Sequence, residues 1–481
     1  MTALRVAGSG DLCSVEVVDL PHHHDGTVHL DALLEACAPA DLLESGDGSG
    51  WSYVVPHGPA RLIDDGVTTR WTDPDGRTSD EGRDPFAAIE RWCDRLGIVP
   101  DAPPPAADDP AFTGGFVGAL AYDLGHRVEH LPRQLADDRA APHLWLHLAE
   151  VVVAVCPARE RVVVLGRDLL GRGDVTARMD DLLARIGRAG QPAAAPAGPR
   201  PPARPPVLRS SLDHASHLAG VEAVLEHIAA GDVFQVNLTQ RLSTTWAHDA
   251  AALYRALRRE SPAAFGALLP AIGVASVSPE TFLAVSGHQV TTRPIKGTRP
   301  RHPDPDLDAA LADDLSTSVK DRAENVMVVD LERNDLGRVC LPGSVRVPEL
   351  VAVEAHPTVW HLVSTVTGEL RPDVGYGELL RATFPCGSIT GAPKIAAMRI
   401  IERVETVRRG WYCGAVGFLS PGAASLSVAI RTATLQPDGT VDYGAGGGIV
   451  ADSDPADERR ESFDKATAFL RAVGLDPEQV T

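Results

Sequence analysis

The sequence has no hydrophobic run long enough to cross a bilayer. Its longest apolar stretch, HLWLHLAEVVVAVC (143–156), is too short and too often interrupted by polar residues. The N-terminus, MTALRVAGSGDLC, has no basic region followed by an apolar segment. We therefore expect no signal peptide and no association with a membrane.

Cysteine and positive charge are also scarce. The seven cysteines are dispersed and form no CxxC pair, which is typical of reduced thiols in a cytoplasmic protein. The chain has 45 Lys and Arg against 65 Asp and Glu, a formal net charge of −20. Nucleic-acid binding needs clustered cations, so we expect no nucleic-acid partner. A small anionic substrate remains compatible, because it responds to local charge.

The chain of 481 residues is long enough for two or three domain-sized units. Residues 188–206, RAGQPAAAPAGPRPPARPP, consist mostly of Ala, Pro, Gly and Arg. Repeated proline fixes the backbone and removes hydrogen-bond donors, which predicts a semi-rigid linker. The sequence thus predicts an N-terminal subdomain at 1–187 and a C-terminal domain at 207–481.

Helical and strand-like patterns alternate irregularly along both parts. Helix start and stop signals predict helices at 84–97, 212–232, 320–335 and 453–474. Strand pairs are predicted at 281–285 with 289–295, and at 426–435 with 440–446. This irregular order indicates an α+β fold rather than repeated βαβ units.

Two predicted helices each carry a pair of acidic residues. Asp321 and Glu324 are three residues apart on one helix, and so are Glu458 and Glu461 on the last. Two such pairs could hold Mg²⁺, which prefers hard oxygen ligands. The alternative is structural, because Glu461 can form an ion pair with Lys465 at the i, i+4 spacing.

Other motifs are weaker taken singly. GAGGGIVADSDP (444–455) lets a backbone approach a ligand closely. Arg431, in VAIRTA, is predicted to lie on a central strand, where it could clamp a carboxylate or pair with a structural acid. His361 lies in an apolar segment and could be a hydrogen-bonded core residue or a catalyst.

The stretch TRPIKGTRPR (292–301) holds four cationic side chains, two prolines and a glycine. Lys296 lies in its centre, between an isoleucine and Gly297. Such a lysine is either a solvated surface charge or a residue held in place for chemistry, and the stretch alone does not decide between them.

Read in order, seven motifs resemble those of the chorismate-utilising enzymes. The motifs are GDVFQVNLTQR (231–241), SPETFL (278–283), PIKGT (294–298), KDRAENVMVVDLERNDLGRV (320–339), CGSITGAPK (386–394), AIRTA (429–433) and GAGGGIVADSDPADE (444–458). A further resemblance lies at 111–132, AFTGGFVGALAYDLGHRVEHLP. The family includes anthranilate synthase component I, isochorismate and salicylate synthases, and aminodeoxychorismate synthase component I.

The resemblance implies a fold of two packed antiparallel sheets flanked by helices, with the site between them. It implies that Glu324 and Glu461 bind Mg²⁺, with Asp321 and Glu458 close by. It also implies an active-site histidine, His361, and a general acid, Glu280, that protonates the departing C4 hydroxyl of chorismate. The implied substrate-binding residues are Gln235, Gly297, Thr298, Thr390, Tyr412, Arg431, Gly446 and Gly448.

Two positions separate the members of the family. Enzymes that add water carry a lysine base where this chain has Gln235, so isochorismate and salicylate synthesis are not expected. Anthranilate synthases read PIAGT where this chain reads PIKGT, the form of the aminodeoxychorismate synthases. The resemblance therefore implies that Lys296 is a covalent nucleophile and that the product is 4-amino-4-deoxychorismate, a precursor of p-aminobenzoate and folate.

The ammonia for this reaction is expected from a separate glutamine amidotransferase subunit, since no cysteine here lies in a G-x-C-x-G setting. The alternative activity is that of anthranilate synthase component I. A non-catalytic protein that only binds an aromatic amino acid is a further alternative. DLLESGDGSGWSYV (41–54) resembles the tryptophan-binding region of the family, and ESPAAFGALL (260–269) could form its second wall.

Overall fold

The computed structural model describes residues 2–6, 12–18, 30–189 except 47, 49, 59, 133 and 134, and 207–479. Most of the predicted linker at 188–206 lies outside these residues. In the described part, no helix is long and apolar enough to cross a membrane.

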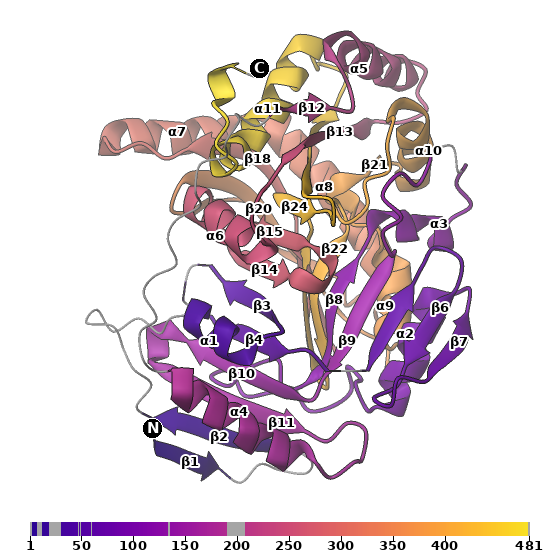
Figure 1. Ribbon diagram of the computed structural model, residues 1–481. Helices are drawn as coiled ribbons and strands as arrows, with labels where there is room; N and C mark the ends of the chain where they lie inside the picture. The colour runs from indigo at the N-terminus through magenta and orange to yellow at the C-terminus, as the bar shows by residue number, and fades with distance from the viewer. Residues whose placement is uncertain are drawn as a thin grey trace.

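Two large antiparallel sheets form the centre of the molecule (Figure 1). Neighbouring strands of the first sheet, in spatial order, are β1 (Thr2–Val6), β2 (Leu12–Val18), β11 (Arg161–Arg167), β10 (Val151–Cys156), β4 (Ser52–Pro56), β3 (Ala40–Ser45), β14 (Phe265–Leu269), β15 (Val274–Ser278), β24 (Thr432–Leu435), β25 (Thr440–Ile449), β13 (Gln235–Thr245) and β12 (Arg209–Ser210). The short strand β21 (Gly391–Ala392) also pairs with β13.

The strands of the second sheet, in spatial order, are β18 (Ile295–Pro300), β20 (Val359–Glu369), β17 (Gln289–Arg293), β16 (Thr281–Ser286), β23 (Ala423–Val428), β22 (Ala415–Ser420), β8 (Gly115–Leu120), β9 (Leu144–Ala149), β5 (Arg61–Asp64), β6 (Thr69–Thr72) and β7 (Thr78–Gly82). β19 (Arg346–Ala355) pairs with β20. Each sheet contains strands from both sides of the linker, since β3 pairs with β14 and β8 pairs with β22.

The two sheets pack face to face through alternating side chains. Tyr53 and Val55 of β4 point toward the second sheet, where they join a cluster with Phe112 and Phe418. The rings of Phe112 and Phe418 are stacked at 4.7 Å. Val54, between Tyr53 and Val55, points to the other face and joins the helices there.

Helices cover the outer faces of both sheets. The first sheet is covered by α1 (Leu30–Cys37), α4 (Val175–Ala189), α5 (His214–Ala229), α6 (Ala250–Glu260), α10 (Lys394–Val404) and α11 (Pro455–Ala472). The second sheet carries α2 (Pro85–Arg95), α7 (Pro305–Thr317), α8 (Val319–Gly337) and α9 (Tyr376–Thr383), and α3 (Gly125–Val128) is a short turn. In Figure 1, α5 and α11 lie at one end of the molecule, and α1 and α4 at the other. This arrangement confirms the predicted α+β fold.

Local sequence signals explain where the long helices begin. Asp454 caps α11 by accepting hydrogen bonds from two backbone N–H groups, and Pro455 occupies its first position. Ser318 caps α8 by accepting a hydrogen bond from the backbone N–H of Asp321. The predicted helices at 84–97, 212–232, 320–335 and 453–474 correspond to α2, α5, α8 and α11.

One predicted strand is wrong. Residues 426–435 were expected to form a single strand, but β23 ends at Val428 in the second sheet and β24 begins at Thr432 in the first. The chain crosses between the sheets at 429–431, and Arg431 has a φ of 52°. Arg431 therefore lies at a junction between the sheets and not on a central strand.

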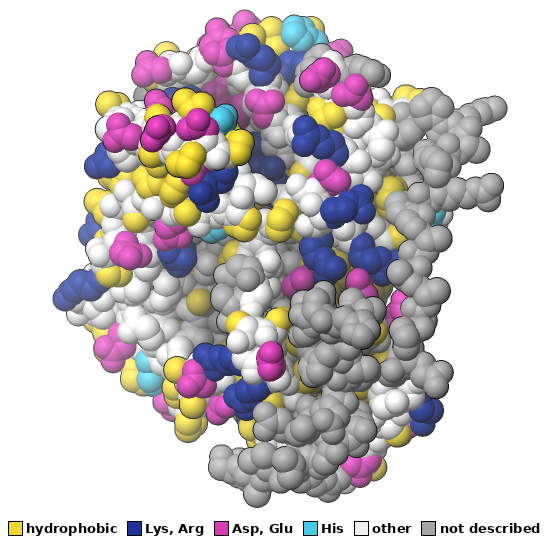
Figure 2. All heavy atoms as spheres, turned by 90° about the vertical axis from the view of Figure 1, so that its left-hand side faces the viewer, with side chains coloured by type: hydrophobic (Ala, Val, Ile, Leu, Met, Phe, Trp, Pro, Cys, Tyr) yellow, Lys and Arg dark blue, Asp and Glu magenta, His cyan; other side chains and the backbone are white. Residues whose placement is uncertain are grey.

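The surface agrees with the composition. On the face drawn in Figure 2, Lys and Arg side chains are scattered among Asp and Glu and form no continuous basic patch.

Candidate active site

A cavity of about 710 Å³ lies between the two sheets and is bordered by β13, β18, β20, β25, α8 and α11. Both sheets and two helices thus contribute to it. It is lined by twelve residues to which the sequence analysis assigned roles: Glu280, Lys296, Gly297, Thr298, Asp321, Glu324, His361, Tyr412, Arg431, Gly446, Gly448 and Glu461.

Lys296 differs from the other cations of its segment. The three arginines are ion-paired: Arg293 with Glu354, Arg299 with Asp314 and Asp321, and Arg301 with Asp308. Within the described residues, Lys296 has no ion pair within 4.0 Å. Its side chain instead borders the cavity, where its positive charge opposes the rise that burial causes in the pKa of Glu280 and of Glu324.

A backbone irregularity beside Lys296 brings β18 against α8. The pairing of β18 with β20 shifts register between Lys296 and Thr298, and Gly297 has a φ of 75°. A Cβ atom on Gly297 would lie 2.9 Å from the Cβ atom of Asp321. Only glycine combines that conformation with so close an approach, so the bulge directs Lys296 toward the cavity.

Glu280 is a buried acid at the wall of the cavity. It lies between β15 and β16, where the chain passes from the first sheet to the second, and is 3% exposed. Burial raises the pKa of Glu280 to about 7, although a hydrogen bond from Ser388 and the charge of Lys296 act against that rise. A carboxyl group that stays protonated near neutral pH can donate a proton to a leaving group.

His361 is neutral at neutral pH. Burial lowers its pKa to about 4, and the nearby His356 and Arg431 act in the same direction. Its Nδ1 atom lies 3.0 Å from the Thr298 hydroxyl. His361 therefore presents an uncharged imidazole to the cavity and can donate or accept a hydrogen bond there.

The two acidic pairs lie on α8 and α11, at the same end of the cavity. Burial raises the pKa of Glu324 despite the opposing charges of Lys296 and Lys320. Glu458 is 4% exposed, and its Oε2 atom has no hydrogen-bond partner among the residues that the structure describes. Hard oxygen donors, one of them buried and unsatisfied, fit a cation such as Mg²⁺.

Lysines neutralise part of this acidic region in the structure. Lys465 forms an ion pair of 2.6 Å with Glu461, the contact that their i, i+4 spacing allows. Lys320 lies 3.6 Å from Glu458. Burial alone would lower the pKa of Lys320, but the four surrounding carboxylates outweigh it and raise the pKa.

The acidic pairs are not preassembled as a tight ligand set. Within the described residues, the closest set of three His, Cys, Asp or Glu ligand atoms is that of Asp41, His57 and His147, all within 4.8 Å. This trio is remote from the cavity lining, and each histidine Nε2 lies 2.8 Å from one Asp41 oxygen. It is a self-contained hydrogen-bonded group and not the predicted magnesium site.

Arg431 is held by a helix rather than by an acid. Its Nη1 atom donates a 2.8 Å hydrogen bond to the backbone carbonyl of Lys465 on α11. Among the described residues it has no carboxylate partner within 4.0 Å. Its guanidinium group also borders the cavity.

Three predicted site residues do not line the cavity. Gln235 is 1% exposed and packs against Gly448, where a Cβ atom would lie 2.0 Å from Gln235 Nε2. The Thr390 hydroxyl donates to the carbonyl oxygens of Cys386 and Gly387, which stabilises that loop. Glu458 is the third, and it is 4% exposed.

Several lining residues were missed by the sequence analysis. They are Asn237, Ser388, Ile430 and Lys320. No spacing signal could identify Lys320, because the acids that surround it come partly from α11, more than a hundred residues away. Ser388 lies within the recognised CGSITGAPK motif, so that motif was its only signal.

A second cavity, of about 170 Å³, is lined by residues of 41–54, the stretch that resembles a tryptophan-binding region, and of 260–269, its predicted second wall. Ser45, Trp51 and Tyr53 line one side, and Phe265 and Gly266 line another. β3 pairs directly with β14, which explains how these distant stretches meet.

A buried acid, a lysine with no ion pair among the described residues, and acidic residues of α8 and α11 thus border one cavity between two antiparallel sheets. The sequence matches the family model of chorismate binding enzymes over residues 59–471. The chain belongs to the chorismate binding enzyme family, as its motifs predicted.

Named relatives fall into two activities. Aminodeoxychorismate synthase component 1 of Salmonella typhimurium is 38% identical over 96% of this chain and 98% of its own length. Anthranilate synthase component 1 of Streptomyces coelicolor is also 38% identical, over 93% of this chain and 87% of its own length. Overall identity therefore does not separate the two activities.

Solved structures share the fold. Anthranilate synthase component I of Streptococcus pneumoniae has a TM-score of 0.74 at 28% identity, covering 87% of this chain and 91% of that chain. The menaquinone-specific isochorismate synthase of Escherichia coli has a TM-score of 0.66 at 19% identity, covering 96% and 94%. This second likeness concerns the fold alone.

The raised pKa of Glu280 predicts a pH-dependent stability. Folded Glu280 keeps its proton up to about pH 7, whereas the unfolded chain releases it near 4.5. Its contribution is complete below pH 4.5 and is lost as the pH rises through about 7, a change of about 3 kcal/mol. Urea unfolding at pH 5 and pH 8 should show Glu280→Gln losing less stability than the parent chain over this interval. Glu35→Gln, on the exposed face of α1, is the control, and equal losses in all three proteins would contradict the prediction.

Proposed function

We propose that this chain converts chorismate and ammonia into 4-amino-4-deoxychorismate, the reaction of aminodeoxychorismate synthase, in p-aminobenzoate and folate biosynthesis. The observation that carries the proposal is Lys296. It lies in a cavity of substrate size, without a counter-ion within 4.0 Å among the described residues, and the buried acid Glu280 borders the same cavity.

In this proposal the amine of Lys296 attacks C2 of chorismate while the C4 hydroxyl departs. Glu280 supplies the proton with which that hydroxyl leaves as water. Ammonia then attacks C4, the bond between C2 and the lysine nitrogen breaks, and Glu280 takes a proton from the new C4 ammonium. Covalent catalysis thereby divides one difficult displacement into two easier ones.

Other residues of the cavity bind and orient the substrate. Arg431 borders the cavity and can donate hydrogen bonds to a carboxylate there, and Gly446 and Gly448 let the substrate approach their backbone because they lack side chains. Neutral His361 and Thr298 supply a hydrogen-bonding pair beside Lys296.

Magnesium belongs to the proposal as a cofactor. Glu324 and Glu461 would hold the ion, with Asp321 and Glu458 close to it. When bound, Mg²⁺ would neutralise and orient the ring carboxylate of chorismate.

Two further binding partners are proposed. The names of the aminodeoxychorismate and anthranilate synthase relatives include "component 1", which supports a second subunit for this chain as well. We assign that subunit the role of a glutamine amidotransferase. Tryptophan is the proposed ligand of the 170 Å³ cavity, whose lining includes Trp51 and Phe265.

A second candidate function is that of anthranilate synthase component I. The observation in its favour is the equal identity of the two sets of relatives. The products distinguish them, since anthranilate synthesis also eliminates pyruvate. Mass analysis of the product from chorismate, Mg²⁺ and ammonium tests the proposal, and anthranilate with pyruvate would overturn it.

We predict that Lys296 forms a covalent adduct. Intact-protein mass after addition of chorismate without ammonia should rise by the mass of chorismate less one water. Lys296→Ala and Lys296→Arg should both abolish the adduct, because a guanidinium is never a neutral amine. Both should also lower turnover by orders of magnitude, each tenfold loss corresponding to about 1.4 kcal/mol of barrier. Lys320→Arg, in the same cavity, should retain the adduct. An adduct that persists in Lys296→Ala would assign the nucleophile elsewhere.

We predict that activity requires Mg²⁺. Chelation with EDTA should abolish turnover, and added Mg²⁺ should restore it. Glu324→Gln and Glu461→Gln should lose most activity and remain folded by circular dichroism, because each removes a charged oxygen ligand. Full activity in EDTA would contradict this prediction.

We predict that the isolated chain uses ammonium salts but not glutamine. Turnover should follow ammonium concentration, and glutamine alone should give no product until an amidotransferase subunit is added. Glutamine-dependent turnover by the purified chain alone would show that it has its own glutaminase activity.

A further inference from the structure

Lysine is rare in this chain, and its positions are unusual. Four of the 45 cationic residues are lysines, and the rest are arginines. Three of the four, Lys296, Lys320 and Lys465, line the cavity of about 710 Å³. A chain that uses arginine almost everywhere else keeps lysine at these positions. This distribution indicates that the ammonium group has a property there that a guanidinium group lacks.

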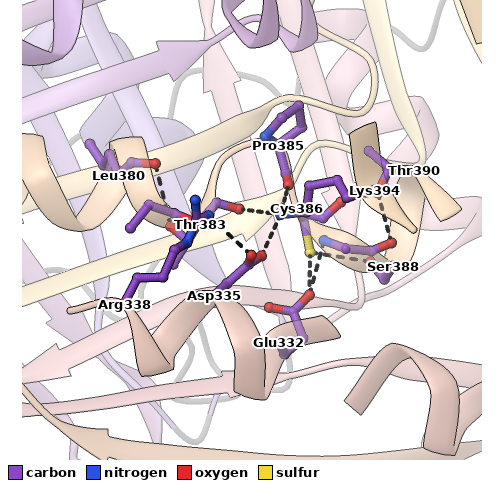
Figure 3. A network of polar contacts seen from close by, with 12 residues as sticks. Glu332, Asp335, Arg338, Leu380, Thr383, Pro385, Cys386, Ser388, Thr390 and Lys394 are labelled. Atoms are coloured by element: carbon purple, nitrogen blue, oxygen red, sulfur yellow. Dashed lines mark hydrogen bonds and ion pairs between the residues drawn. The ribbon is translucent and has the colours of Figure 1, made fainter. Parts of the chain in front are cut away.

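The fourth lysine has a fully bonded ammonium group. Lys394 contacts the carboxylate of Asp335, and it donates hydrogen bonds of 3.1 and 2.8 Å to two backbone carbonyls, those of Thr383 and Pro385 (Figure 3). An ammonium group has three protons to donate, and all three are used here. Lys394 is therefore fixed in place, and its role is structural.

The lysines of α8 and α11 are held less completely. Besides its ion pair with Glu461, Lys465 donates one hydrogen bond, of 2.9 Å, to the Gly446 carbonyl. Lys320 lies 3.6 Å from Glu458 Oε1, which is longer than a hydrogen bond. The side chains of Lys320 and Lys465 are 48% and 37% exposed. Neither ammonium group is enclosed by protein, so each can move away from its carboxylate.

Two carboxylates and an ammonium group converge beside Gly447 of β25. A Cβ atom at that position would lie 3.1 Å from Glu458 Oε2, 3.5 Å from Glu461 Oε1 and 3.6 Å from Lys465 Nζ. Glu458 is buried, and its Oε2 atom accepts no hydrogen bond from the described part of the chain. The ammonium group of Lys465 thus lies beside an oxygen that it leaves unsatisfied, and that oxygen remains available to a cation.

We propose that the ammonium groups of Lys320 and Lys465 compete with a divalent cation for the acids of α11. The cation displaces Lys465 from Glu461, and it takes the place of Lys320 beside Glu458. No covalent bond changes in this exchange, and both lysines keep their protons and their charge. The exchange rests on the metal site of the proposed function, and it assigns to the two lysines the control of the affinity of that site.

The difference between ammonium and guanidinium groups accounts for the lysines. Arginine can hold a carboxylate through two parallel N–H donors, which a metal ion would have to break together. An ammonium group is a compact charge on a flexible chain, so a single contact holds it and a rotation of the side chain releases it. Its single charge also attracts a carboxylate less strongly than a divalent ion does at the same distance. Lysine therefore offsets the repulsion between the acids without closing the site to a metal.

The test measures the affinity for Mn²⁺, a probe for the Mg²⁺ site whose free form is detected by electron paramagnetic resonance. Without chorismate, Lys465→Met and Lys320→Met should each bind Mn²⁺ about tenfold more tightly than the parent chain, because a competing positive charge is gone. Lys465→Arg should bind Mn²⁺ less tightly, since arginine releases Glu461 less readily. Arg460→Met is the matched control, because it removes an exposed positive charge from the same helix and should leave the affinity unchanged.

A second measurement follows the lysines themselves. Because the chain has four lysines, acylation with an amine-reactive reagent followed by peptide mass analysis reports on each of them separately. Mg²⁺ should increase the acylation of Lys465, because the ion releases its ammonium group from Glu461. The acylation of Lys394 should not change, because its three bonds lie outside the exchange. Equal acylation of Lys465 with and without Mg²⁺ would overturn the proposal.

The outcomes separate the exchange from the proposed function. Equal Mn²⁺ affinity in the parent chain and both methionine variants would overturn the exchange and leave the metal site standing. If none of the chains bound Mn²⁺, both the exchange and the metal site would be refuted. Tighter binding by the methionine variants, together with a parent chain that makes no 4-amino-4-deoxychorismate, would support the exchange and refute the proposed function.

Discussion

Two crossings of the chain between the sheets organise the active site. One crossing, at 279–280, carries Glu280 from β15 to β16; the other, at 429–431, carries Arg431 from β23 to β24. Backbone hydrogen bonds join them, from Val428 N–H to the Glu280 carbonyl and from Val277 N–H to the Arg431 carbonyl. Because the crossings are joined, the proposed acid and the proposed carboxylate clamp are held in a fixed relation, and the space between the sheets stays open at this point.

Helix α8 positions further residues along the cavity. Its first turns carry Asp321 and Glu324, while Glu332, two to three turns further on, contacts the loop beside Glu280. The close approach of Gly297 to Asp321 fixes β18 against the beginning of the same helix. One rigid element therefore places the acidic pairs, the strand of Lys296 and the loop of Ser388 relative to one another, so a shift of α8 would disturb all three together.

The charge inside the cavity differs from the net charge of the whole chain. The chain is strongly acidic overall, with a formal net charge of −20. Inside the cavity, however, Lys296, Lys320 and Lys465 face the acids, and burial keeps Glu280 protonated near neutral pH. An anionic substrate can enter such a site because its local charge is nearly balanced, although the whole protein repels anions at long range.

The sequence by itself determined the α+β class, the helices α2, α5, α8 and α11, and the family, because caps, periodicity and ordered motifs are local features. It also determined the residue types at the site, including the lysine of PIKGT. Only the tertiary structure decided that Arg431 lies at a crossing, that Lys320 faces acids from two helices, and that Gln235 and Thr390 lie behind the cavity wall. It alone revealed Glu332 beside Cys386. Each of these features depends on contacts between residues far apart in the chain. The burial of a side chain and the resulting shift of its pKa arise only when those residues pack together.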